Sequence, residues 1–164
     1  MTSYVVMGVS GCGKSLIGQG FAAASHATFI DGDSLHPPAN IAKMSRGQPL
    51  TDSDRAPWLD RVGATLATPG TVVACSALKR MYRDQIRAVA GGPVIFLYLR
   101  GRRETLLARV SSRPSHFMPP TLLDSQLATL EPPARDELHV VADIEQTPVQ
   151  IIAIFLSGSD RMAD

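Results

Sequence analysis

Residues Gly8–Ser15 read GVSGCGKS and match the phosphate-binding pattern G-x-x-x-x-G-K-[ST] in full. Glycines allow such a loop to curl until its backbone N–H groups face phosphate oxygens, and the following helix adds its positive N-terminus. In this pattern Lys14 reaches the β- and γ-phosphates, and the Ser15 hydroxyl is a ligand of Mg²⁺. We therefore expect ATP and Mg²⁺ to bind here. The loop residues expected to contact ATP are Gly8, Val9, Ser10, Gly11, Cys12, Gly13, Lys14 and Ser15.

Two carboxylates, Asp31 and Asp33, follow the short apolar run Thr28–Ile30. Residues two apart in an extended segment point to the same side, so both carboxylates are expected to face the phosphate end of the site. One can hold Mg²⁺, directly or through water, and the other can accept the proton of an attacking hydroxyl. The alternative is an acidic turn with Gly32 in a left-handed conformation.

Basic side chains four residues apart recur on a helix expected after the third apolar run. They are Lys79 and Arg83, and together with His36 and Arg55 they are expected to form a pocket for a small anionic substrate rich in hydroxyls. Charges on a solvated helix surface are the alternative for each of them. Trp58 is interpreted as a core residue.

A second basic pair, Arg109 and Arg113, precedes the helix-breaking stretch RPSHFMPP. Arginines at the mouth of a mobile segment suit a clamp on a transferring phosphoryl group, so both are expected to be catalytic. His116 lies inside that stretch and is assigned to the same lid. A solvated basic face is the alternative.

The elements that must position these residues alternate along the chain. Strands are expected at Tyr4–Met7, Thr28–Ile30, Thr71–Cys75, Val94–Leu99 and His139–Ala142. Helices are expected at Ser15–Ala24, Pro37–Arg46, Thr51 to about Ala67, Lys79–Val89, Glu104–Ser112, Thr121–Thr129 and Pro148–Leu156. This alternation predicts an α/β fold with a parallel sheet covered on both faces, in which ligands bind beyond the carboxyl ends of the strands.

Length and composition limit the class of protein. The chain has 164 residues, of which 45% are hydrophobic and 19% charged, so we expect one domain spanning residues 1–164. A net charge of +1 does not favour nucleic acid or an anionic membrane as a partner. The chain has two cysteines and lacks an apolar run of about 18 residues, which predicts a cytoplasmic protein without a disulfide framework or a membrane span.

Four blocks of the sequence together resemble the gluconokinase family, P-loop enzymes related to shikimate kinase. The blocks are MGVSGCGKS, DGDSLHPPANIAKMSRGQPLTDSDRAPWL, CSALKRMYRDQIR and SSRPSHFMPPTLLDSQLATLEPP, and they cover nearly the whole chain in the family's order. The resemblance implies a five-stranded parallel sheet of the nucleoside-monophosphate-kinase type, with a lid at about residues 109–125. It also implies transfer of the ATP γ-phosphate to the terminal hydroxyl of D-gluconate, and a homodimer.

The same resemblance implies individual roles. Asp33 is placed at the substrate hydroxyl and Asp31 nearer Mg²⁺. The gluconate side is assigned to His36, Arg55, Lys79 and Arg83, and the lid to Arg109, Arg113 and His116.

Other functions of a P-loop protein remain as alternatives. A shikimate-kinase-like enzyme would carry a Gly-Gly-Gly turn where this chain has SALK at residues 76–79. A non-catalytic nucleotide switch that reads guanine would need N-K-x-D, which the sequence lacks.

Cys12 stands where a small Ser or Ala is more usual in the resembled family. The inward N–H groups, the helix N-terminus and Lys14 all favour negative charge, so the pKa of Cys12 is expected to be low and its thiol reactive. We expect it to be alkylated faster than Cys75 and to be protected by Mg·ATP. The alternative is a thiol that points away into the core and is inert.

Overall fold

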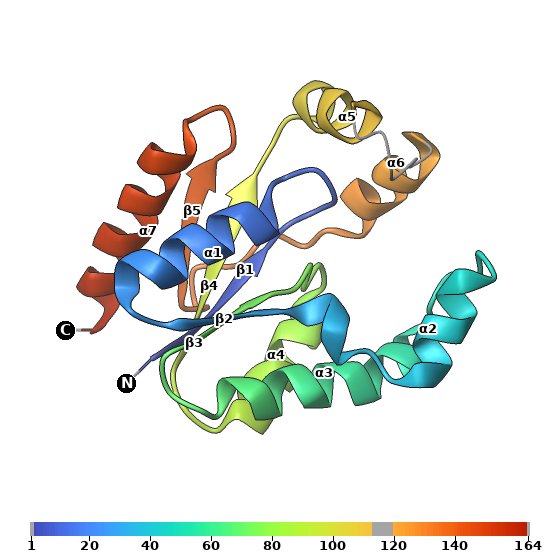
Figure 1. The fold of residues 1–164 in the computed structure, drawn as a ribbon, viewed down its shortest axis with the longest axis horizontal. Coiled ribbons are helices and arrows are strands. Elements are labelled where there is room, and N and C mark those ends of the chain that lie inside the picture. The colour runs from blue at the N-terminus through green and yellow to red at the C-terminus, as the bar shows by residue number, and fades with distance from the viewer. Residues whose placement is uncertain (1, 113–119, 164) are drawn as a thin grey trace.

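The computed structural model describes residues 2–112 and 120–163, in which strands and helices alternate (Figure 1). The strands are β1 (Ser3–Met7), β2 (Thr28–Asp31), β3 (Thr71–Ala74), β4 (Val94–Arg100) and β5 (His139–Asp143). The helices are α1 (Lys14–Ser25), α2 (Pro38–Ser45), α3 (Asp52–Leu66), α4 (Arg80–Ala90), α5 (Arg103–Ser111), α6 (Pro120–Thr129) and α7 (Pro148–Ala163). The bounds differ from the expected ones by one residue or two at most ends, but α7 runs seven residues further and a short 3₁₀ helix, η1 (Gly32–Leu35), follows β2.

The five strands form one parallel sheet in the order β2-β3-β1-β4-β5, which confirms the predicted fold class. β1 is central, and its Val5 lies opposite Val73 of β3 and Phe96 of β4. All carboxyl ends therefore meet at one edge of the sheet, with the phosphate loop at the middle of that edge.

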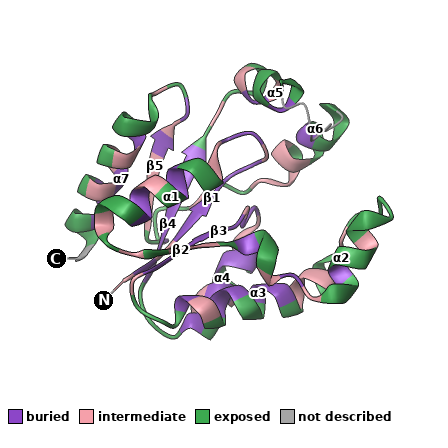
Figure 2. Cartoon of the chain, viewed as in Figure 1, coloured by how far each residue is buried: buried purple, intermediate pink, exposed green. Residues whose placement is uncertain are grey.

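The two faces of the sheet are covered by different helices, as Figure 1 shows. Successive residues of β1 point to opposite faces of the sheet. Val6 packs into a core with helices α1 and α7, while Val5 and Met7 pack into a core with α3 and α4. The central strands are mostly buried: every residue of β3 is buried, as are all residues but one in β1 and in β4 (Figure 2). This two-sided burial explains why the central strands read as unbroken apolar runs.

The helices nearest the site begin at clear sequence signals. Thr51 caps α3 as expected: its hydroxyl accepts a hydrogen bond from the N–H of Asp54, whose carboxylate accepts one from the N–H of Thr51. α2 starts with Pro38, whose missing N–H costs nothing at that position. α2 projects from the body of the protein and is largely exposed (Figure 2). None of the helices within the described residues has the length and apolar character to cross a membrane.

Candidate active site

The phosphate loop connects β1 to α1 and leaves the N-terminus of α1 open. Gly13, the N-cap, has a φ of 91°, which a residue with a side chain rarely adopts, and no side chain caps the helix. The first N–H groups of α1, those of Lys14 to Leu16, therefore remain available to an anion. The Lys14 ammonium donates to the carbonyls of Gly8 (3.0 Å) and Val9 (3.2 Å), which holds it against the loop.

A cavity of about 730 Å³ lies at the carboxyl edge of the sheet. The phosphate loop contributes Ser10, Lys14 and Ser15 to its lining, and the ends of β2 and β3 contribute residues 31, 33 and 74–76. The connection between α2 and α3 closes a second side, and α6 closes a third with Leu122, Ser125, Gln126 and Thr129. Asp33 and two further lining residues, His36 and Arg55, form what we call the polar wall.

Asp31 and Asp33 both line this cavity and both are exposed. Asp33 lies in η1 rather than in an extended segment, and its N–H donates to Asp31 Oδ1 at 3.0 Å. Gly32 is required for packing and not for a left-handed conformation, because a Cβ there would come 2.3 Å from the carbonyl oxygen of Ala74. The turn is thus pressed against the end of β3, and Asp31 holds Asp33 in place.

His36 is 8% exposed and is oriented by Asn40. Asn40 Nδ2 must be a donor because it binds the carbonyl of Asp54 at 2.9 Å, and the same nitrogen lies 3.3 Å from His36 Nδ1. His36 Nδ1 is then an acceptor, so the proton of the neutral ring is on Nε2. Burial lowers the pKa of His36, an effect to which Arg55 adds and which Asp33 opposes.

Trp58 lines the cavity although it was interpreted as a core residue only. It is buried, stacks on His36 and donates its Nε1–H to the carbonyl of Gly32 at 2.8 Å. A sequence signal existed: Trp58 is three residues after Arg55 in α3, so the two share a helix face.

Arg55 and Lys79 meet different surroundings. Arg55 lines the cavity and donates to the carbonyl of Leu50 at 2.9 Å and to the hydroxyl of Tyr82 at 3.4 Å. Lys79 is not a lining residue; its ammonium binds Asp52 at 3.3 Å, the carboxylate that also accepts the Tyr82 hydroxyl at 2.5 Å. The hydrogen bonds from Tyr82 and Lys79 lower the pKa of Asp52. Asp52 therefore takes up the charge of Lys79 outside the cavity, and Tyr82 is a cavity residue that the sequence reading missed.

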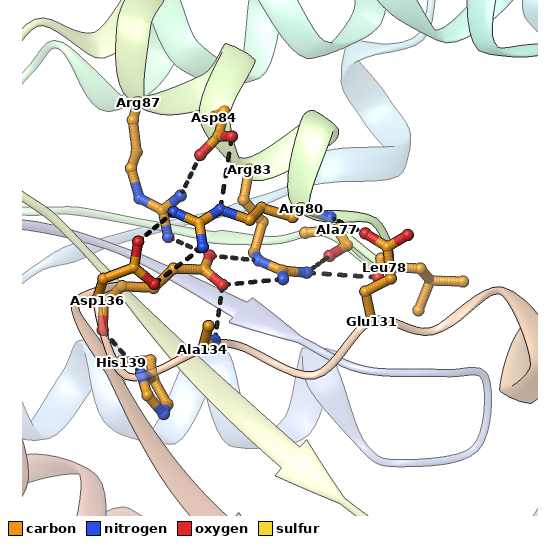
Figure 3. Close-up of polar contacts among 11 residues, drawn as sticks. Ala77, Leu78, Arg80, Arg83, Asp84, Arg87, Glu131, Ala134, Asp136 and His139 are labelled. Carbon is orange, nitrogen blue, oxygen red and sulfur yellow. Dashed lines mark hydrogen bonds and ion pairs between the residues drawn. The ribbon is translucent and has the colours of Figure 1, made fainter.

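Arg83 was expected to bind substrate, and the structure places it elsewhere. Its side chain is 0% exposed, and its guanidinium binds both carboxylate oxygens of Glu137, at 2.7 and 3.1 Å. It also donates to the carbonyl of Ala77 at 2.8 Å (Figure 3). Ala77 has a φ of 45°, which is uncommon for a residue other than glycine. Arg83 thus supports the turn at the end of β3 from behind and does not line the cavity.

Glu137 is the centre of this buried group of charges. Burial by itself raises the pKa of its carboxyl, but hydrogen bonds from Arg83, from the N–H of Ala134 and from Arg87 together lower it to about 2. Arg87 approaches the carboxylate at 2.6 Å. The segment after α6 is in this way tied to α4 through an ion pair within the protein.

Of the three residues assigned to the lid, only Arg109 lies within the described part of the chain. It is exposed, and its Nη2 donates to the carbonyl of Ile144 after β5 at 2.8 Å. It is not a lining residue of the cavity. Arg113 and His116 fall outside the described residues.

Cys12 does not match the expected reactive thiol. It is 1% exposed and packs in the core on the α1 face of the sheet, near Val9 and Leu106. Burial raises the pKa of Cys12 and outweighs the opposite effect of Lys14. The prediction was wrong because the side chain of this loop position points into the core, away from the inward N–H groups.

The chain is similar to known proteins in sequence and in fold. A family model described as shikimate kinase matches residues 10–153. The thermosensitive gluconokinase of Escherichia coli strain K12 is 51% identical over 146 residues, which cover 85% of this chain and 76% of that protein. The gluconokinase of Gluconobacter oxydans strain 621H is 48% identical over 149 residues, which cover 88% and 83%. The crystal structure of a gluconokinase from Sinorhizobium meliloti 1021 superimposes with a TM-score of 0.90 at 49% identity, covering 99% of this chain and 93% of that one.

The phosphate loop, the acidic turn and the polar wall thus occur on a fold shared almost end to end with these kinases. The chain belongs to the gluconokinase family, within the group of P-loop proteins that the shikimate kinase model describes.

Proposed function

We propose that this protein transfers the γ-phosphoryl group of ATP to the terminal hydroxyl of D-gluconate and forms 6-phospho-D-gluconate. One observation carries the proposal: a single cavity joins Lys14 and Ser15 of the phosphate loop to the polar wall. A phosphate loop alone fits any nucleotide-binding protein. A carboxylate, an imidazole and a guanidinium across the same cavity suit an acceptor with hydroxyls and a carboxylate, and the similar proteins named above are gluconokinases.

On the nucleotide side, the chain supplies positive charge at fixed positions. The open N-terminus of α1 and the ammonium of Lys14 bind the phosphates, and Lys14 stabilises the charge that spreads over the transferring group. Arg109 remains a candidate for a contact with ATP, because it stands beside the loop and pairs only with the carbonyl of Ile144 among the described residues.

The donor set fits Mg²⁺. Ser15 of the phosphate loop and Asp31 at the end of β2 line the same cavity, and a hydroxyl with one carboxylate is typical of sites that complete their coordination with phosphate oxygens and water. Among the described residues no group of three or more His, Cys, Asp or Glu side chains forms a self-sufficient metal site, which agrees with such sharing. When bound, Mg²⁺ neutralises charge on the β- and γ-phosphates.

On the acceptor side, Asp33 accepts the proton of the attacking hydroxyl. Asp31 and the packing of Gly32 against β3 hold it there. The Nε2–H of His36 donates to a substrate hydroxyl, and Arg55 pairs with the substrate carboxylate. Lys79 and Arg83 support the site from outside the cavity and are left out of the substrate contacts.

We also propose a homodimer, on the resemblance to the family, and a cytoplasmic location, on the cysteine usage and hydropathy of the sequence. Light scattering of the purified protein tests the homodimer, with a mass near twice 17.6 kDa as the expected result.

A coupled assay for ADP release tests the function. Gluconate, glucose, shikimate and a nucleoside monophosphate are offered separately with Mg·ATP. We expect turnover with gluconate and little with the others. A neutral sugar, unlike gluconate, brings no carboxylate to Arg55, whose ion pair with Asp52 within the protein is long, at 3.9 Å. Equal turnover of glucose, or a preference for shikimate, would reject gluconate as the substrate.

A further inference from the structure

Gln126 of α6 contacts the phosphate loop directly. The backbone N–H of Ser10 donates to Gln126 Oε1 at 2.8 Å, across 116 positions of sequence. Both residues line the cavity. This hydrogen bond places a neutral amide where the phosphate loop meets the acceptor side.

Gln126 is held there by anchors at two points of the chain. Leu123, three residues earlier and on the same helix face, is fully buried in the core that contains Val9 and Cys12. After α6, the N–H of Glu131 donates to the carbonyl of Leu78 at 2.7 Å, and its carboxylate accepts the N–H of Arg80 at 2.8 Å (Figure 3). The amide is therefore preorganised by packing and by backbone hydrogen bonds.

The hydrogen bond to Gln126 occupies the N–H of Ser10, one of the loop residues expected to contact ATP, but it leaves the N–H groups at the N-terminus of α1 available to phosphate. The unpaired N–H groups of α1 begin at its N-terminus, at Lys14, whereas Ser10 lies on the opposite arm of the loop, three residues before the N-cap. Gln126 can keep its bond to Ser10 while ATP occupies the N-terminus of α1.

The second half of the amide has no such partner: among the described residues no hydrogen bond takes up Gln126 Nε2. The bond from Ser10 identifies Oε1 as the acceptor end of the amide, so the other end is the NH₂ group with its two donors. We propose that Gln126 is a catalytic residue whose Nε2–H donates to a γ-phosphoryl oxygen of ATP during transfer. This inference rests on the proposed phosphoryl transfer at this site and adds a contact from α6.

Binding measurements with two nucleotides test it. Gln126→Leu removes the donor, and we expect the Kd of the magnesium complex of an imido analogue of ATP to rise about tenfold, as for one hydrogen bond to a charged group. The Kd of Mg·ADP, which lacks the γ-phosphoryl group, should change less than about twofold. No acceptor is present in this experiment, so its result does not depend on gluconate being the substrate.

Gln126→Glu distinguishes the role of the amide oxygen from that of the amide nitrogen. It keeps an oxygen for the N–H of Ser10 but replaces the donor by a negative charge, so kcat should fall about 10²-fold or more. Gln150→Glu is the matched control, because Gln150 Oε1 also accepts a backbone N–H, that of Thr147 at 2.9 Å, outside the cavity. It should retain normal kcat and normal affinity for both nucleotides.

Three results would overturn the proposal. Gln126→Leu could weaken ADP and the ATP analogue equally, which would make the residue a support of the loop only. It could raise the KM of the acceptor alone, which would place the amide on the acceptor. Gln126→Glu could keep normal kcat. Should Gln126→Leu fail to fold, the Glu variant decides alone.

Discussion

The indole of Trp58 lies nearly parallel to the imidazole of His36, with ring centroids 4.2 Å apart and 15° between the planes. The same indole donates its Nε1–H to Gly32, in the turn that carries Asp33. One buried side chain thus positions two members of the polar wall.

Trp58→Phe should separate these two contacts. It keeps a ring for His36 but leaves the carbonyl of Gly32 without its donor, which should cost about 1–3 kcal/mol of unfolding free energy. Because Asp33 loses support, kcat should also fall. Urea unfolding followed by circular dichroism and steady-state kinetics measure both effects. Tyr4→Phe, in a partly buried aromatic pair with Phe21 away from the cavity, is the control. A loss of stability with unchanged kinetics in Trp58→Phe would argue against the positioning role.

His36 should make the protein less stable in mild acid. Its pKa is lower in the folded protein than in the unfolded chain, where it is about 6.5, so the unfolded state binds the proton more readily. The contribution of His36 is complete above pH 6.5 and is lost as the pH falls below that value. Unfolding free energies from pH 7.5 to 5 should therefore fall more steeply in the wild type than in His36→Gln. Parallel curves would show that His36 is not held neutral.

Asp33→Asn keeps the shape of the turn and removes the proton acceptor. We expect kcat to fall about 10²–10⁴-fold with nearly normal ATP affinity. Asp31→Asn should instead raise the Mg²⁺ concentration needed for half-maximal activity. Magnesium titrations of both variants distinguish the roles, and a reversal of the two results would exchange the base and the metal residue.

Substitutions of Arg83 and of Arg55 should have opposite effects on stability and on the KM of the acceptor. Arg83→Met leaves Glu137 buried without its bidentate partner, which should cost about 3–5 kcal/mol of stability. Arg55→Met should change stability little but raise the acceptor KM, because it removes a guanidinium from the cavity. Urea unfolding and acceptor kinetics of the pair test this. A stable Arg83→Met variant with a raised acceptor KM would restore Arg83 as a substrate contact.

Both cysteines should be inert in the folded protein. Burial raises the pKa of Cys12 and raises that of Cys75 to about 12, so neither forms a thiolate near neutral pH. Iodoacetamide should label neither in the native state and both in urea, as mapped by mass spectrometry. Rapid labelling of native Cys12 that Mg·ATP suppresses would show that the loop opens in solution.

The order of strands and helices and the phosphate loop were predictable because their signals are local. Apolar runs, caps and the spacing of Gly8, Lys14 and Ser15 all lie within a few residues of what they determine. Asp31, Asp33, His36 and Arg55 also reach the expected edge of the sheet. Their meeting follows from the parallel topology, whichever helix lies between them.

The remaining errors concern the direction of a side chain. Four-residue spacing puts Lys79 and Arg83 near one another on a helix, but it does not say which face meets solvent, cavity or core. That is decided for Arg83 by Glu137, 54 positions later, and for Lys79 by Asp52, 27 positions earlier. Gln126 was missed for the same reason, since its partner Ser10 lies at the other end of the chain.

The residues of the polar wall and Trp58 all lie in one segment of the chain, the connection between the edge strand β2 and its neighbour β3. The phosphate loop belongs to β1, at the centre. The residues proposed to bind the acceptor and those of the phosphate loop therefore lie in separate segments of the chain. The segment between β2 and β3 can be substituted without changing the strands of the sheet, provided that the core residues Leu59, Val62 and Leu66 of α3 are kept. Exchanging this one segment of the chain should therefore change which acid the kinase phosphorylates.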